Sequence, residues 1–440
     1  MHSNANDSRD DWPNEAYGWY VVFVLCICSI VAFIDRQIIN LLVEDIKADL
    51  QLSDTDIGML QGLAFALFYA FAAIPLGRLA DTGNRRRIIA FGIAVWTAAA
   101  AACGLARSFA QLFVARTMVG VGEATLTPSG FSMLADYFRP SRLSLPLAVM
   151  TGSSFFGSGV ALLIGGYVIA SLGRVEQVTL PLFGALAPWE AAFIIGALPG
   201  VFVTILFLLT VREPARRGSA GDVVANPPLG EVLGFMVQHR GVFGAVFLGV
   251  SVLAAVQFCL GAWVPAHFIR NLGWTAPEVG YAYGLIFLFC GTGGVIAGGW
   301  LADRQFARGQ LDAHLRTVRL SAFAALPFVI TFPLMTDGRA AVALLAPAVF
   351  FGTMAFGAGP SLIPVICPPR MRGLLIAIYL LIANIVGQAG GPLIVALFTD
   401  RVFGAPELVR YSLVVAPAAL LLLGALLVSM GLRGLREFRA

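Results

Sequence analysis

The chain alternates long apolar runs with short polar breaks, and the length of these runs indicates its class. A hydrocarbon core about 30 Å thick is crossed by roughly 20 mainly apolar residues in a helix. Twelve such runs, separated by charged or turn-forming residues, occur in the sequence. They lie at residues 17–43, 56–79, 87–106, 109–136, 143–172, 188–211, 241–269, 277–302, 316–336, 341–366, 373–400 and 407–432. The pattern predicts an all-α polytopic membrane protein with twelve transmembrane helices.

Composition excludes the other common classes. Of the 440 residues, 58% are hydrophobic and 12% charged, which is too apolar for soluble domains or for a disordered chain. Six cysteines in that length do not make a disulfide scaffold. The basic residues fall in short clusters between apolar runs, a pattern typical of membrane topology and not of a nucleic-acid-binding face. We therefore expect a multi-pass protein of the plasma membrane, or of a bacterial inner membrane, with lipids around it and no nucleic-acid partner.

The distribution of positive charge predicts the orientation. If the N-terminus is cytoplasmic, 20 Lys and Arg residues outside the spans lie on the inner side and 7 on the outer side. This excess places both termini in the cytoplasm. The longest polar break contains the Pro227–Pro228 pair and an amphipathic stretch at 229–237, and it divides the spans six and six. The predicted organisation is a cytoplasmic tail at 1–16, a six-helix bundle at 17–211, a cytoplasmic linker with an interfacial helix at 212–240, a second six-helix bundle at 241–432 and a cytoplasmic tail at 433–440.

A short motif recurs at matching positions in the two halves. Gly77-Arg-Leu-Ala-Asp81 closes the second run, and Gly299-Trp-Leu-Ala-Asp303 closes the eighth. Repetition six helices apart predicts two pseudo-symmetric bundles with a binding site between them near the bilayer midplane. We expect glycine-lined contacts among the second, fifth, eighth and eleventh helices to carry the movement of one bundle against the other. The residues expected to form an inner gate are Gly77, Asp81, Arg85, Arg86, Arg87, Gly299, Asp303 and Arg304.

Several kinds of chemistry lack the residues they need. The only lysine, Lys47, follows no glycine-rich phosphate-binding loop, so hydrolysis of a nucleotide is excluded. The four histidines are scattered, and Cys26 and Cys28 point to opposite faces of a helix. No nucleophile has a histidine placed to activate it. We expect no metal, no bound cofactor and no enzymatic activity.

Four charged residues lie deep within predicted spans, and their signs balance. They are Asp35 and Arg36 in the first run and Arg116 and Glu123 in the fourth. An ionised side chain at the bilayer centre costs at least about 2.5 kcal/mol, so these groups are expected to pair and to face a cavity. Arg116 and Glu123, seven residues apart, share one helix face about 10.5 Å apart along the axis. The alternative is a buried ion network that only orients two helices.

The second half contains no charge at this depth, so it is expected to offer mainly shape and apolar surface to a ligand. Residues expected to line the cavity in the two halves are Tyr69, Thr151, Gln257, Tyr283, Asn384 and Gln388.

The helix count, the repeated halves and the Gly-x-x-x-Asp motif resemble the major facilitator superfamily over nearly the whole chain. That family's loop motif has a basic residue directly after the Asp, whereas Thr82 follows Asp81 here, which leaves open which arginine closes the inner gate. Within the superfamily, the chain looks most like the Spinster family. The stretches that carry this resemblance are Ile34-Asp35-Arg36-Gln37, Leu60-Gln61-Gly62, Arg116-Thr-Met-Val-Gly120-Val-Gly122-Glu123-Ala124 and Arg212-Glu213-Pro214.

The resemblance implies a carrier of amphipathic lipids, such as lysophospholipids or sphingosine-1-phosphate-like molecules. It implies that Asp35 and Glu123 are proton-linked carboxyls, with Arg36 and Arg116 as their partners or as the headgroup anchor. A proton gradient would then supply the energy without a cofactor, and we expect the chain to act as a monomer. Organic-anion symporters of the superfamily share similar Asp-Arg and Gly-x-x-Glu-Ala patterns and are the alternative. A third reading is a membrane scaffold that transports nothing. The direction of proton coupling stays open.

Overall fold

The computed structural model describes residues 12–139, 142–173, 175, 177–181, 183–216, 228–310 and 312–437. Most of the predicted tail at 1–16, the linker stretch at 217–227 and the last residues of the tail at 433–440 lie outside the described residues. The described chain is almost entirely helical, which confirms the predicted all-α class.

The first half contains nine α-helices, one π-helical turn and a small hairpin among its described residues. In chain order these are α1 (Glu15–Leu41), α2 (Val43–Leu50), α3 (Asp54–Gly58), η1 (Met59–Leu63), α4 (Ala64–Thr82), α5 (Arg85–Cys103), α6 (Phe109–Glu123), α7 (Leu126–Tyr137), α8 (Ser144–Leu172), β1 (Val178–Leu180), β2 (Gly184–Leu186) and α9 (Pro188–Thr210). The antiparallel hairpin pairs Val178 with Leu186 and was not predicted from the sequence.

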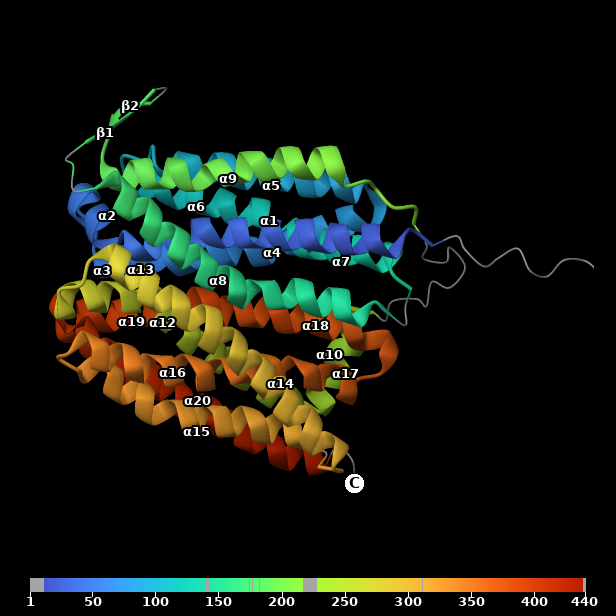
Figure 1. The fold of residues 1–440 in the computed structure, drawn as a ribbon. Helices are drawn as coiled ribbons and strands as arrows, with labels where there is room; N and C mark the ends of the chain where they lie inside the picture. The colour runs from blue at the N-terminus through green and yellow to red at the C-terminus, as the bar shows by residue number, and fades with distance from the viewer. Residues whose placement is uncertain are drawn as a thin grey trace, which may run out of the picture.

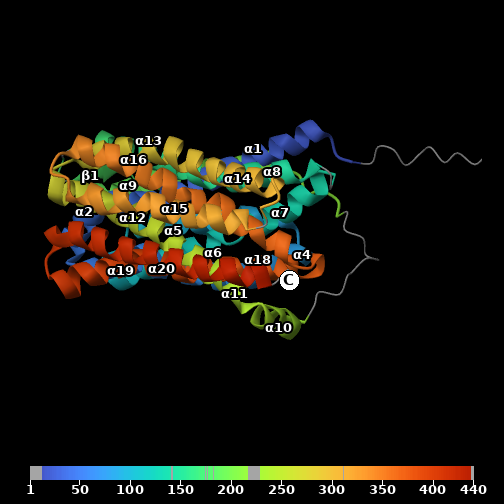
Figure 2. The same ribbon diagram turned by 90° about the horizontal axis from the view of Figure 1, so that it is seen from below.

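The linker and the second half follow. Their elements are α10 (Leu229–Gln238), α11 (Arg240–Gly244), η3 (Ala245–Gly249), α12 (Val250–Leu272), α13 (Ala276–Leu285), η4 (Ile286–Gly291), α14 (Thr292–Ala307), α15 (Ala313–Thr331), η5 (Phe332–Leu334), α16 (Gly338–Ala358), η6 (Pro360–Leu362), α17 (Ile363–Ile366), η7 (Pro369–Met371), α18 (Arg372–Ile382), η8 (Ala383–Ala389), α19 (Gly390–Leu397), η9 (Phe398–Phe403), η10 (Pro406–Leu408) and α20 (Val409–Glu437). The amphipathic stretch predicted at 229–237 is the helix α10, which Figure 2 shows projecting from the side of the bundle.

Eleven helices in the described part of the chain are long and apolar enough to cross a membrane. The run at 109–136, predicted as one helix, is instead divided into α6 and α7 at Ala124 and Thr125. The backbone N–H of Thr125 donates to the carbonyl of Gly122 at 3.2 Å, and its hydroxyl donates to the same carbonyl at 2.8 Å. These bonds close a turn in place of a regular α-helical register, so α6 ends directly at Glu123.

The helices of the two halves lie in two groups side by side (Figure 1). One end of the bundle, where α1 begins and α20 ends, is called the termini end. The other, where α2, α3 and the hairpin lie, is called the far end (Figure 1). The sequence predicts that the termini end is cytoplasmic, and that orientation stays a prediction.

Two seams join the halves, and both depend on close backbone contact at glycines. In the first seam, η1 packs on η8, and a methyl group at Gly62 would lie 2.7 Å from the carbonyl oxygen of Ala389. In the second, α8 packs on α13 and η4, where a methyl group at Gly166 would lie 3.3 Å from the Cα atom of Gly280. Contacts become sparse beyond both seams, between α4 and α18 and between α8 and α14. The halves are therefore joined toward the far end and separate toward the termini end, with the expected second, fifth, eighth and eleventh spans at the seams.

A charge cluster at the far end also joins the halves. Arg270 of α12 donates to both carboxylate oxygens of Asp54, each at 2.8 Å, and its Nε donates to Glu44 at 2.7 Å. Lys47 forms a second ion pair with Asp54. The side chain of Asp54 is fully buried, so its two cationic partners offset the loss of its hydration. This cluster, with the seams, fixes the far end in its closed arrangement.

The close contact of Gly62 with η8, in the first seam, predicts that a single added methyl group destabilises the protein. We expect Gly62→Ala to lower the free energy of unfolding by about 1–3 kcal/mol, because the methyl group must displace the backbone of η8. A methyl group at Gly152 of α8 would meet nothing within 4 Å, so Gly152→Ala is the matched control. The control should be neutral, or stabilising by up to about 1 kcal/mol. Thermal unfolding of both variants in one detergent measures the difference, and equal melting temperatures would contradict the seam.

Candidate functional site

The four deep charges come from two neighbouring helices of the first half. Asp35 and Arg36 lie on α1, and Arg116 and Glu123 lie on α6. Close packing places α6 beside α4, because a methyl group at Gly120 would lie 2.6 Å from the carbonyl oxygen of Phe65. The glycines that precede Glu123 thus bring its carboxylate into the interior of the first half.

Arg36 and Glu123 form an ion pair. The Nε of Arg36 donates to Oε2 of Glu123 at 2.7 Å, and a second guanidinium nitrogen contacts the same oxygen. The side chain of Glu123 is 2% exposed, whereas that of Arg36 is 22% exposed. The pair therefore joins a fully buried anion to a cation that still reaches solvent.

Arg116 and Asp35 do not pair through their charges. Arg116 donates from Nη1 to the backbone carbonyl of Asp35 at 2.9 Å. Among the described residues, Asp35 Oδ1, Glu123 Oε1 and Arg116 Nε have no hydrogen-bond partner. Asp35 and Arg116 are both almost completely buried. Of the four charged side chains, Arg36 is therefore the one that is partly exposed in this conformation, and a cavity that all four face stays a prediction.

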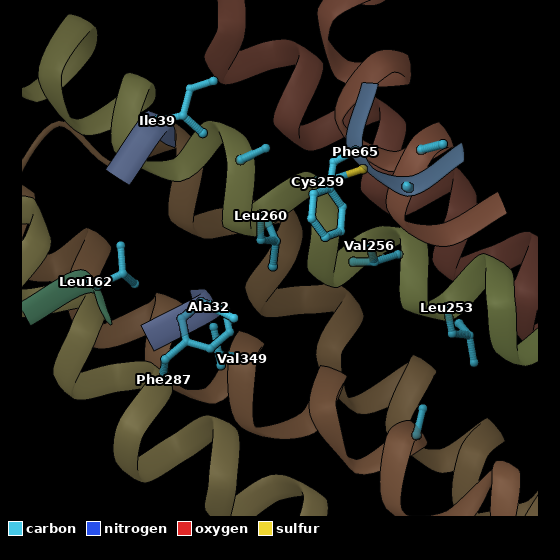
Figure 3. Packing of buried hydrophobic residues seen from close by; sticks show 14 of the residues in the cluster. Ala32, Ile39, Phe65, Leu162, Leu253, Val256, Cys259, Leu260, Phe287 and Val349 are labelled. Atoms are coloured by element: carbon cyan, nitrogen blue, oxygen red, sulfur yellow. The ribbon is translucent and has the colours of Figure 1, made fainter. Parts of the chain in front are cut away.

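Aromatic rings surround the guanidinium of Arg36. Its Cζ lies 4.2 Å from the ring centre of Phe65, 4.9 Å from that of Phe33 and 5.6 Å from that of Tyr69. Phe65 and Tyr69 are stacked with their centres 5.6 Å apart. Figure 3 shows the Phe65 ring among Val256, Cys259 and Leu260 of α12. One ring thus contacts the charged site on one side and the second half on the other.

A chain of amide side chains, which was not predicted from the sequence, also connects the halves. Asn40 donates to Gln37 at 2.9 Å, and Gln61 of η1 donates to Asn40 at 3.0 Å. The same Gln61 nitrogen donates to the carbonyl of Ala262 on α12 at 3.2 Å. The signal that could have identified it is the presence of three amides in otherwise apolar spans.

Of the residues expected to line a cavity, Tyr69 alone joins the charged site. Gln257 and Tyr283 are buried in the second half, and within the described chain the Gln257 amide and the Tyr283 hydroxyl have no hydrogen-bond partner. Thr151 is exposed and donates to its own helix at Leu147, and Asn384 does the same at Leu380. Gln388 is buried in η8. Their contact with a ligand stays a prediction.

The repeated motif has different surroundings in its two copies. The first lies at the termini end, where Arg85 is buried and binds Asp136 and Glu213, the latter at 2.7 Å. Glu213 also accepts the backbone N–H of Arg86 at 2.7 Å. All of these groups belong to the first half or to the start of the linker, so Arg85 fastens α5 to α7 and to the chain after α9.

The other gate residues make fewer contacts. Arg86 also donates from its guanidinium to the carbonyl of Leu208, and Arg87 is exposed. Gly77 is part-buried near Pro128, and the side chain of Asp81 lies outside the described part of the structure. In the second copy, Asp303 and Arg304 are exposed, Arg304 lies over the ring of Trp300, and Gly299 packs near Gly357. Closure of a gate by these residues stays a prediction.

The sequence is similar to one known protein family and to several known transport proteins. The profile described as the Major Facilitator Superfamily matches residues 25–392. An MFS-type efflux pump of Mycolicibacterium smegmatis is 30% identical over 411 residues, covering 93% of this chain and 91% of that protein. A probable L-galactonate transporter of Escherichia coli is 23% identical over 341 residues, or 75% of this chain and 72% of that protein. The sphingosine-1-phosphate transporter SPNS2 of Xenopus tropicalis is 23% identical over 418 residues, or 90% and 77% of the two chains.

A solved structure shares the fold. The crystal structure of a bacterial homolog to the human lysosomal transporter Spinster, in an inward-facing and unoccupied conformation, superposes with a TM-score of 0.83. The two sequences are 24% identical, and the match covers 97% of this chain and 99% of that chain.

The contacts of Arg85 with Asp136 and Glu213 predict that this residue stabilises the fold. Measurement of stability separates this role from closure of a gate. We expect Arg85→Ala to lower the free energy of unfolding by about 3–5 kcal/mol, because it leaves Asp136 and Glu213 without their shared cation. Arg87→Ala, an exposed neighbour on the same helix, should change it by less than about 0.5 kcal/mol. Thermal unfolding of the two purified variants measures both. A stable Arg85→Ala protein that is impaired only in transport would instead favour a gate.

Proposed function

Because the chain belongs to the major facilitator superfamily, a family of membrane transporters, we propose that it is a proton-coupled secondary active transporter of an amphipathic, lipid-like substrate. The substrate would be of the lysophospholipid or sphingosine-1-phosphate type, and a proton gradient would supply the energy. Asp35 and Glu123 would carry the coupled proton, and Arg36 and Arg116 would balance their charge or hold the headgroup.

The ion pair between Arg36 and Glu123 is the observation that supports proton coupling best. A carboxylate this deeply buried is stable as an anion only while a cation stays beside it. If the substrate draws Arg36 away, Glu123 is left as an unpaired charge in a medium of low dielectric, and protonation removes that charge. If Glu123 is protonated first, Arg36 is released to meet the substrate. Either order links one proton to one substrate at the same site.

The two seams support alternating access. They join the halves toward the far end, and the halves separate toward the termini end, which is predicted to be cytoplasmic. Opening the far end requires that the bonds between Arg270 and Asp54 break while the separated parts of the halves come together. The two halves would then rock about the region where Phe65, beside the charged site of the first half, meets α12 of the second half.

Two features support an amphipathic substrate. Arg36 is the charged group that reaches solvent, and its neighbours Phe33, Phe65 and Tyr69 are large aromatic residues. A charged group beside aromatic side chains suits a molecule with a polar head and a hydrocarbon chain. One relative, SPNS2, is named for a lipid of this kind.

The alternative is a proton-coupled organic-anion symporter. It is supported by the two guanidiniums of the site and by the relative named as a probable L-galactonate transporter. A scaffold without transport activity is the third candidate, and it would make the four charges dispensable.

Proton coupling predicts a selective defect in Glu123→Gln. The amide keeps the size of the side chain but cannot gain or lose a proton, so uphill transport driven by a pH gradient should stop while substrate exchange continues. Glu231→Gln, at an exposed ion pair with Arg370, is the control and should behave like the wild type. Uptake into proteoliposomes with and without an imposed pH gradient measures both. Normal pH-driven accumulation by Glu123→Gln would remove this residue from the coupling.

The substrate class predicts how affinity depends on chain length. For carboxylates of equal charge, from propionate to decanoate, each buried CH2 group contributes about 0.8 kcal/mol, so affinity should rise about fourfold for each carbon added. Thermal-shift titration of the purified protein measures the series. A small-anion site would show no such rise, and the organic-anion alternative would then be preferred.

A further inference from the structure

An apolar groove runs between α5 and α6 on the outer surface of the first half. Its volume is about 810 Å³. Three exposed apolar side chains line it, those of Leu105, Val114 and Met118. Six of its eleven lining residues are alanines, namely Ala98, Ala99, Ala102, Ala106, Ala110 and Ala115. The groove therefore exists because short side chains leave space that the longer ones beside them do not fill.

The matching helix of the second half has larger side chains at the same places. α5 follows the first copy of the repeated motif and α15 follows the second, and each helix has 19 residues. Counted from the helix starts, Ala98 of α5 corresponds to Leu326 of α15. Ala102 corresponds in the same way to Ile330. The hollow thus comes from the alanines of the first half and not from the way in which two spans pack.

The groove lies at the depth of one bilayer leaflet. On α6 it extends from Ala110, the second residue of the helix, to Met118, which is about 12 Å at 1.5 Å per residue. One leaflet contributes about 15 Å to a hydrocarbon core about 30 Å thick. α6 begins at the far end, and α5 lies at the edge of the bundle farthest from the second half (Figure 1). An acyl chain from the leaflet at the far end matches this length, whereas a helix that spans the membrane would need a groove about twice as long.

A charged side chain lies at the far-end mouth of the groove. The backbone N–H of Arg107, the residue after Ala106, donates at 2.7 Å to the side chain of Gln111, which lines the groove. The Arg107 side chain is 61% exposed and forms an ion pair with Glu190 of α9. Glu190 is 1% exposed, and its other carboxylate oxygen accepts the backbone N–H of Ala187 at 2.8 Å. A guanidinium has five N–H donors, so Arg107 keeps donors for a phosphate, while the Glu190 carboxylate is covered.

We propose that this groove binds one acyl chain of a phospholipid from the leaflet at the far end, and that the phosphate of its headgroup meets Arg107. The bound lipid is a constituent of the membrane and not the transported substrate. Ala115 lines the groove directly before Arg116, so the lipid supports the part of α6 that carries the deep charges. It stabilises the first half without entering the site between α1 and α6. The inference does not depend on the proposed transport function.

Filling the groove provides the first test. Ala102→Trp adds a large ring at an exposed position within the groove, and Ala94→Trp, two turns earlier at an exposed alanine of α5 outside the groove, is the matched control. Native mass spectrometry of the delipidated full-length protein, titrated with dioleoylphosphatidylglycerol, counts the bound lipids. The wild type and Ala94→Trp should bind the first lipid equally. We expect Ala102→Trp to bind it about tenfold more weakly, which corresponds to the loss of roughly ten atom–atom contacts.

The headgroup provides the second test. The comparison lipid is monogalactosyl dioleoylglycerol, which has the same chains and no phosphate. A basic residue near the membrane surface contributes about 1 kcal/mol to the binding of an anionic lipid, so the wild type should prefer the phospholipid about fivefold. The double variant Arg107→Gln/Glu190→Gln removes both charges and leaves no buried carboxylate unpaired. It should bind the two lipids equally.

Three results would overturn the proposal. Equal lipid binding by Ala102→Trp and Ala94→Trp would place the lipid elsewhere on the surface. A wild type without preference for the phospholipid, or a preference that survives in the double variant, would remove Arg107 from the headgroup site. A wild-type dimer that Ala102→Trp dissociates would assign the groove to a second copy of the chain. Because each measurement counts bound lipid or bound protein, the outcome is independent of any transport assay.

Discussion

The structure depends on one requirement: a carboxylate inside a membrane-spanning bundle must keep a positive charge beside it. Glu123 lies at the end of α6, almost without solvent contact, and Arg36 of α1 meets it at 2.7 Å. Removal of either partner would leave an unpaired charge in a medium where water cannot stabilise it. The packing of α6 against α4 through Gly120 and the break at Ala124 and Thr125 both serve to place this carboxylate. Loss of the Arg36 contact, or protonation of Glu123, therefore affects both α1 and α6.

The same pair lies next to the contacts that join the halves. Phe65, which lies beneath the Arg36 guanidinium, packs on α12, and Gln61, one turn earlier, donates to the carbonyl of Ala262 on that helix. Phe65 therefore lies between Arg36 and the second half. At the far end, α12 also carries Arg270, which binds Asp54. One helix of the second half therefore contacts both the charged site and the cluster that closes the far end, which offers a direct physical route between them.

The repeated motif shows that similar sequence need not give similar contacts. In the first copy, the nearby Arg85 is buried and holds Asp136 and Glu213, whereas in the second, Asp303 and Arg304 are exposed. The partners make the difference, because Glu213 comes from the chain after α9 and joins α5 only in the folded protein. A motif specifies where a charge is placed along a helix, and the tertiary structure supplies what that charge binds.

By itself, the sequence determined the helical membrane-spanning class, the positions of nearly all spans and the identity of the four deep charges. These follow from local composition: a run of about 20 apolar residues predicts a span wherever it occurs, and a charge within one is visible without a structure. The tertiary structure alone decided that Arg36 pairs with Glu123, that Arg116 binds the carbonyl of Asp35, and that three rings enclose one guanidinium. Apart from the contact between Arg36 and Phe33, one turn apart on α1, these contacts join residues far apart in the chain, and their geometry depends on how the helices pack. The break between α6 and α7 escaped prediction for a related reason, since a hydroxyl bonded to a backbone carbonyl replaces a helical turn without altering the apolar pattern.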